Sequence, residues 1–92
     1  YDWWNGTRYT AAMTTEIRMK ADEARRLKTD TSFLSFMQEV RDDQITVFTD
    51  SAASDVEARE AAHGIICALN LIEMKLDAAT TAETFLDRKQ RK

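Results

Sequence analysis

The chain has 92 residues, no proline, only two glycines and a formal net charge of −3. A turn-rich β-sandwich or barrel uses both proline and glycine, so these counts exclude that class and favour long helices. One cysteine rules out an intrachain disulfide, and no apolar run approaches the ~20 residues that a membrane span needs.

Residues 1–12 follow no helical or strand period. They hold every Tyr and Trp of the chain, namely Tyr1, Trp3, Trp4 and Tyr9. Trp and Tyr dominate interface hot spots, so we expect this arm to anchor in a partner or a neighbouring copy. Two other interpretations stay open: the aromatic side chains fold back over the domain's own core, or the segment is appended and not native, since Met13 reads like the start of a reading frame.

The first helix is predicted to begin near Thr14 or Thr15, either of which is a suitable cap. It carries a narrow apolar stripe at spacings of four, three and three, made by Ile17, Ala21, Ala24 and Leu27. The capping residues of segment 29–32 are expected to end this helix and to start the next one.

The second helix is expected to carry two adjacent apolar stripes. One consists of Phe33, Met37, Val40 and Val47, and the other of Leu34, Met37, Ile45 and Phe48. The β-branched run 45–49 is also compatible with a short strand. We favour a helix, because nothing else in the chain could pair with a lone strand. A loop over 50–54 follows, and Ser54 with Glu57 forms a predicted capping box.

The third helix is the strongest predicted element. Its heptad stripe comprises Ala58, Ala62, Ile65, Leu69, Ile72, Leu76 and Ala79. We expect Ile65, Leu69, Ile72 and Leu76 to pack helices together or to join copies. Ile66, Cys67, Leu71 and Met74 widen the apolar surface, which indicates contact with more than one neighbour. Gly64 is interpreted as a site of close helix approach, and Cys67 as a small, inert core residue.

Residue types that carry chemistry are scarce. With one histidine, His63, no Ser-His-Asp set exists, and there is no glycine-rich phosphate loop. The carboxylate pairs at 42–43 and 57–60 are interpreted as solvated helix faces. We therefore expect no enzyme, no cofactor, no metal and no small-molecule substrate.

Charge is unevenly distributed along the chain. Residues 30–60 hold eight acids and two bases, whereas four of the last five residues are basic. The two interpretations are solvated helix faces and head-to-tail contact between copies. If the protein handled nucleic acid instead, its phosphate contacts would be Arg18, Lys20, Arg25, Arg26, Arg88 and Lys89.

Together these patterns predict an all-α fold of three helices, or a helical hairpin, with a long C-terminal helix. The expected organisation is an aromatic arm over 1–12, a helical domain over 13–87 and a basic tail over 88–92. A chain of this size buries only roughly 60% of its unfolded surface, so the wide apolar face predicts a homo-oligomer.

Residues 20–76 also resemble the small all-α proteins encoded among the head and packaging genes of tailed bacteriophages. The resemblance rests on the layout of three segments: 21–27 (ADEARRL), 30–34 (DTSFL) and the helix that opens at 55–60 (DVEARE) and continues at 68–76 (ALNLIEMKL). It implies a non-enzymatic structural or assembly protein that makes protein–protein contacts in a virion or packaging complex, located in the host cytoplasm or the virion. The alternatives are a nucleic-acid-handling subunit, such as a packaging-enzyme small subunit, and a regulator or inhibitor of a host protein.

Overall fold

The structure is a computed structural model that describes residues 8–90, and it is all-α over that range. Three helices follow one another: α1 (Ala11–Thr29), α2 (Thr31–Asp50) and α3 (Val56–Gln90). The expected three helices with a long last one are confirmed. Segment 45–49 lies inside α2, so the preference for helix over strand is confirmed as well.

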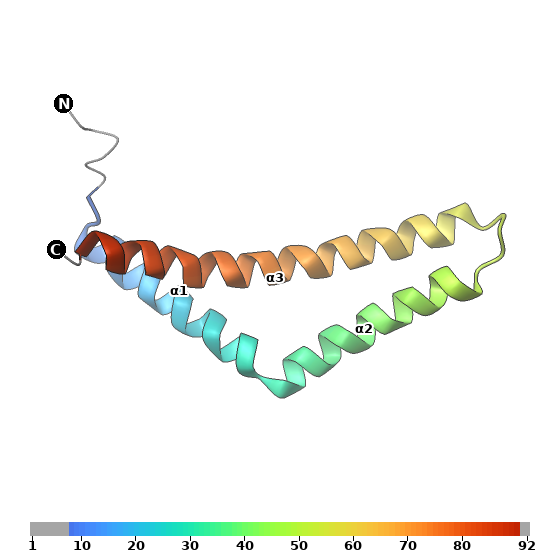
Figure 1. Ribbon diagram of the computed structural model, residues 1–92, viewed down its shortest axis with the longest axis horizontal. Coiled ribbons are helices and arrows are strands. Elements are labelled where there is room, and N and C mark those ends of the chain that lie inside the picture. The colour runs from blue at the N-terminus through green and yellow to red at the C-terminus, as the bar shows by residue number, and fades with distance from the viewer. Residues whose placement is uncertain (1–7, 91–92) are drawn as a thin grey trace, which may run out of the picture.

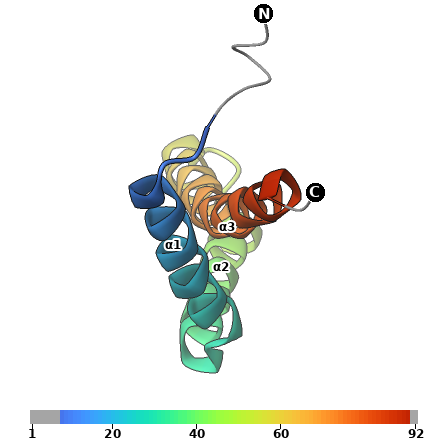
Figure 2. The same cartoon turned by 90° about the vertical axis from the view of Figure 1, so that its left-hand side faces the viewer.

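The long helix α3 is one side of an open triangle, and the two shorter helices form the other sides (Figures 1 and 2). Each short helix runs antiparallel to α3: α1 lies along its C-terminal half and α2 along its N-terminal half. The radius of gyration is 19.1 Å, whereas a compact protein of this length has a value of about 12 Å. The helices therefore pack in pairs and do not close around one shared core.

A single residue, Asp30, joins α1 to α2 at the vertex of the triangle. Its backbone N–H donates to the carbonyl of Leu27 at 3.2 Å, which closes the end of α1. Its carboxylate accepts from the backbone N–H of Phe33 at 3.0 Å, which caps the start of α2. The predicted boundary at 29–32 is confirmed, because one Asp serves both helix ends.

Two predicted helix starts are wrong. Helix α1 begins at Ala11, because the Thr10 hydroxyl accepts from the N–H of Met13 at 3.1 Å, and so it starts before Thr14. Helix α3 is capped by Asp55, whose carboxylate accepts from the N–H of Ala58 at 3.2 Å. A carboxylate beside the free N–H groups of a helix start is also favoured by the helix dipole, so Asp55 takes the place expected for Ser54.

The turn between α2 and α3 is held by Arg59. Its guanidinium donates to the carbonyl of Ala52 at 2.6 Å and to that of Ala53 at 2.7 Å. A third hydrogen bond reaches the hydroxyl of Ser51 at 3.3 Å. These three hydrogen bonds hold the turn that follows α2 against the first turns of α3.

The core of the described chain is small. Its buried apolar residues are Ala21, Ala24, Ala62, Leu69 and Leu86. Apart from Leu86, the buried residues of α1 and α3 belong to their predicted stripes, but Leu27 of the α1 stripe and Ile65 and Ile72 of the α3 stripe remain 38%, 40% and 43% exposed. No residue of α2 is buried. The pair α1–α3 consequently holds most of the buried side chains, and α2 lies on α3 with its apolar residues only half covered.

Two expectations about the middle of α3 are wrong. A Cβ atom built on Gly64 would meet nothing within 4 Å, so this glycine serves no close helix contact inside the described chain. Cys67 is exposed and is not a core residue. Both lie on the side of α3 that α1 and α2 do not cover, which the heptad stripe alone could not indicate.

Candidate functional site

An ion-pair cluster joins α1 to the C-terminal half of α3. Arg18 donates to Glu83 at 3.2 Å and to Asp87 at 2.9 Å. Arg25 pairs with Glu83 at 2.6 Å and also with Asp22 on its own helix. Glu83 thus bridges two arginines that are two turns apart on α1, which sets the antiparallel register of the two helices.

The cluster occupies two of the residues named above as phosphate contacts. The hydrogen bond that Arg18 donates to Asp87 raises the pKa of Arg18, opposed by desolvation, and the hydrogen bonds that Arg25 donates to Glu83 and Asp22 raise the pKa of Arg25. Both guanidinium groups are therefore held by carboxylates of this chain. Of the other named bases, Lys20 and Arg26 are exposed on α1, and Arg88 and Lys89 lie in the last turn of α3.

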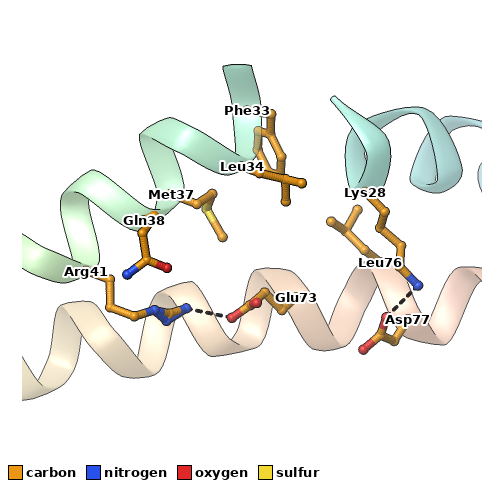
Figure 3. Close-up of a pocket in the computed structure, with 9 residues that line it drawn as sticks. All are labelled: Lys28, Phe33, Leu34, Met37, Gln38, Arg41, Glu73, Leu76 and Asp77. Carbon is orange, nitrogen blue, oxygen red and sulfur yellow. Dashed lines mark hydrogen bonds and ion pairs between the residues drawn. The ribbon is translucent and has the colours of Figure 1, made fainter. Parts of the chain in front are cut away.

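A hollow of about 490 Å³ lies beneath the vertex, where α1 and α2 diverge from α3 (Figure 3). Phe33, Leu34 and Met37 line it from α2, and Leu76 lines it from α3. Ion pairs bridge the helices on either side: Lys28 to Asp77 at 2.7 Å and Arg41 to Glu73 at 2.6 Å. The hollow is lined by apolar side chains, and the charged side chains at its edge are paired with one another. Such a surface could accommodate an apolar side chain.

The outer face of α3, turned away from the two short helices, carries a second apolar stripe. Its members follow spacings of four, three, four and seven residues: Cys67, Leu71, Met74, Ala78 and Phe85. All five are exposed. Leu71 is 60%, Met74 64% and Phe85 54% exposed. We call this set the outer α3 stripe.

Cys67 and His63 lie one helical turn apart on this face. The Sγ atom of Cys67 is 3.7 Å from Nε2 of His63 and 3.9 Å from Nδ1. Within residues 8–90 no group of three His, Cys, Asp or Glu side chains is placed to hold a metal ion.

Of the four aromatic residues expected to anchor a partner, the structure describes Tyr9. It is half-buried and lines a shallow hollow with Phe85 and Arg88 at the C-terminal end of α3. The guanidinium carbon of Arg88 lies 5.7 Å from the centre of the Phe85 ring. Tyr9 therefore lies against its own domain, and the other three (Tyr1, Trp3 and Trp4) fall outside the described residues.

Comparisons with protein-family models, with curated proteins and with solved structures found no match for this chain. None of the helices that the structure describes has a stretch both long and apolar enough to cross a bilayer.

Sequence reasoning found part of this arrangement. It singled out Cys67, Leu71 and Met74 as additional apolar surface, but it missed Phe85, although the seven-residue spacing continues to that position. It also missed the carboxylates Glu83 and Asp87, because an ion pair between residues more than sixty positions apart leaves no local signal.

Proposed function

We propose that this protein is a non-enzymatic assembly protein, whose function is to make protein–protein contacts through helix faces that its own fold leaves uncovered. The observation that carries the proposal is the exposure of large apolar side chains on all three helices. The described residues exposed in this way are Met13, Met19, Leu27, Leu34, Phe36, Val40, Ile45, Phe48, Val56, Ile65, Leu71, Ile72, Met74 and Phe85.

Exposed apolar side chains are normal when they are scattered, but on α2 and α3 several of them lie three or four residues apart, on one side of the helix. On α2, which has no buried residue, Phe36 is 67% exposed. On α3, Leu71 and Met74 are exposed in successive turns. The chain exposes 7213 Å², whereas a compact monomer of its mass exposes about 5500 Å². An assembly partner would cover part of this excess and supply the burial that the small core lacks.

Sedimentation velocity over a concentration series tests the proposal. We expect a species heavier than the 10.6 kDa chain, which dissociates on dilution. As a matched pair, Met74→Ser should shift the equilibrium toward the monomer, whereas Gln38→Ser, which is also exposed but lies on α2, should not. A monomer at every concentration would contradict self-assembly.

The narrower expectation, a virion or packaging complex of a tailed phage, has its support in the resemblance of residues 20–76 and stays a prediction. The role of the aromatic arm over 1–12 as an anchor in a partner also stays a prediction. Replacing both Trp3 and Trp4 by Ala is expected to weaken assembly while leaving the helical circular-dichroism signal unchanged. Unchanged assembly in that double variant would remove the anchor role.

The nucleic-acid alternative requires the basic residues to meet phosphates. Arg18 and Arg25 are paired with carboxylates, so such binding would have to exchange those pairs. A gel-shift titration at two salt concentrations is the direct test, because phosphate contacts weaken steeply with salt. We expect no shift at low salt, and a shift that disappears at high salt would favour this alternative instead.

A further inference from the structure

The outer α3 stripe lies at the centre of a longer pattern with opposite charges at its two ends. The alternating three- and four-residue spacing that relates Cys67, Leu71, Met74 and Ala78 also continues outward in both directions. Toward the N-terminus it reaches Glu60 and then Glu57, and toward the C-terminus it passes Phe85 and reaches Arg88; all of these residues are exposed. One face of α3 is therefore acidic at its start, apolar in its middle and basic at its end.

This charge order distinguishes the two ways in which two copies of α3 could pair. A parallel pair would place acids beside acids and Arg88 beside Arg88, which is unfavourable. An antiparallel pair places Glu57 of each copy opposite Arg88 of the other. The contact is then self-complementary about a two-fold axis, as closed dimers require.

The register that pairs Glu57 with Arg88 also aligns four of the five apolar residues of the stripe with one another. Cys67 lies ten residues after Glu57, and Ala78 lies ten residues before Arg88, so these two small residues face each other. Leu71 and Met74, at fourteen residues from the respective ends, meet at the centre. Leu71 and Met74 thus meet around the two-fold axis, and the small Cys67 and Ala78 lie beside them, whereas Phe85 lies further out, opposite Glu60 of the other copy.

We propose that two copies of this chain pair antiparallel through the outer α3 stripe, with Leu71 and Met74 at the centre and Glu57 opposite Arg88 of the other copy at each end. This inference rests on the proposed assembly function and names its partner and surface.

Disulfide trapping tests the register. In the antiparallel pair the two Cys67 residues lie eleven positions out of line, about 16 Å along the helix axis, too far for a disulfide, which needs Cα atoms within about 7 Å. We expect the unaltered chain to remain uncrosslinked when oxidised glutathione is added. Ala78→Cys should give a covalent dimer through the native Cys67 of the other copy. The same substitution combined with Cys67→Ser should give none.

Other results overturn the inference in identifiable ways. Rapid crosslinking of the unaltered chain through Cys67 would indicate a parallel pair or another antiparallel register, and either would contradict the proposed contact. An absence of crosslinking in Ala78→Cys, in a sample that sedimentation shows to be assembled, would place the contact elsewhere and leave the assembly function intact. If sedimentation shows that both the unaltered chain and Ala78→Cys are monomers, this inference and the proposed assembly function are both wrong.

A second pair of variants tests the surface without cysteine chemistry. Leu71→Glu places a charge at the centre of the proposed contact, and Ser35→Glu places the same charge at an exposed polar position of α2. We expect Leu71→Glu to raise the dimer dissociation constant at least tenfold and Ser35→Glu to leave it within twofold. Equal effects would contradict the assignment of the outer α3 stripe.

Discussion

The two halves of α3 differ in how far the chain completes its own packing. Along the C-terminal half, α1 contributes two buried alanines and two arginines that pair with α3, and Leu86 is fully buried. Along the N-terminal half, Ala62 and Leu69 of α3 are buried, but α2 itself brings no buried residue and leaves Phe36, Val40, Ile45 and Phe48 exposed. Small residues let α1 lie close to α3, whereas the bulky apolar residues of α2 are spread over too wide an arc for one helix to cover.

Replacing a buried residue in the C-terminal half of α3 should lower the free energy of unfolding more than any other change considered. Leu86→Ala removes the only large side chain in the described range that is fully buried, so we expect a loss of about 2–4 kcal/mol in the free energy of unfolding. Phe36→Ala in the other half, measured at concentrations low enough to keep the chain monomeric, should change it by less than about 0.5 kcal/mol. Urea titration followed by circular dichroism gives both values, and equal losses would remove the contrast between the halves.

The turn at 51–55 joins α2 to α3. The hydrogen bonds that Arg59 donates to this turn are expected to make the next largest contribution to stability. Arg59→Ala removes three hydrogen bonds from a half-buried guanidinium, so we expect a loss of about 1–2 kcal/mol. Amide hydrogen exchange should show faster exchange in the last turn of α2 and unchanged protection in α1. The control is Arg26→Ala, which replaces an exposed arginine of α1. It should change neither the free energy of unfolding nor the amide exchange in the last turn of α2.

A gain in stability is expected at Gly64. Its position is helical and a Cβ atom would meet nothing, so Gly64→Ala should raise the free energy of unfolding by about 0.5–1 kcal/mol. Thermal and urea unfolding of the two chains side by side would measure it. A loss would mean that something lies against the glycine in solution, on the very face that the outer α3 stripe occupies.

The smallest effect is expected from the ion-pair cluster. Glu83→Gln removes the carboxylate shared by Arg18 and Arg25, but the side chains of both arginines are more than 40% exposed, so the midpoint of thermal unfolding should fall by only about 1–3 °C. The difference between the two chains should shrink in 1 M salt, because screening weakens the pairs in the original chain. A difference that salt does not change would mean that Glu83 acts through packing.

The sequence predicts the elements of this fold better than their arrangement. Helix periodicity and the capping residues around Asp30 locate three helices, because both are local properties of the chain. The errors at the helix starts also have a local cause, since Thr10 and Asp55 are as good caps as the residues chosen. The open triangle could not be predicted, because it depends on which part of the broad apolar surface of α3 each short helix covers.

The candidate surface was predictable in part for the same reason. The spacing that joins Cys67 to Leu71 and Met74 is visible in the sequence, and so is its continuation to Phe85. Its exposure is not, because an apolar stripe on a helix normally faces the core. Only the placement of α1 and α2 on the opposite side of α3 shows that Leu71 and Met74 remain uncovered.

The most direct test of the central claim, that this chain completes its packing with a second copy, is the concentration dependence of its thermal unfolding. When folding is coupled to assembly, the folded state becomes less stable on dilution, because the partner copy is part of that folded state. We expect the midpoint to fall by several degrees between 100 μM and 1 μM chain, together with a loss of the dimer in sedimentation. A midpoint that stays constant over this range, with a monomer at both ends, would contradict the claim.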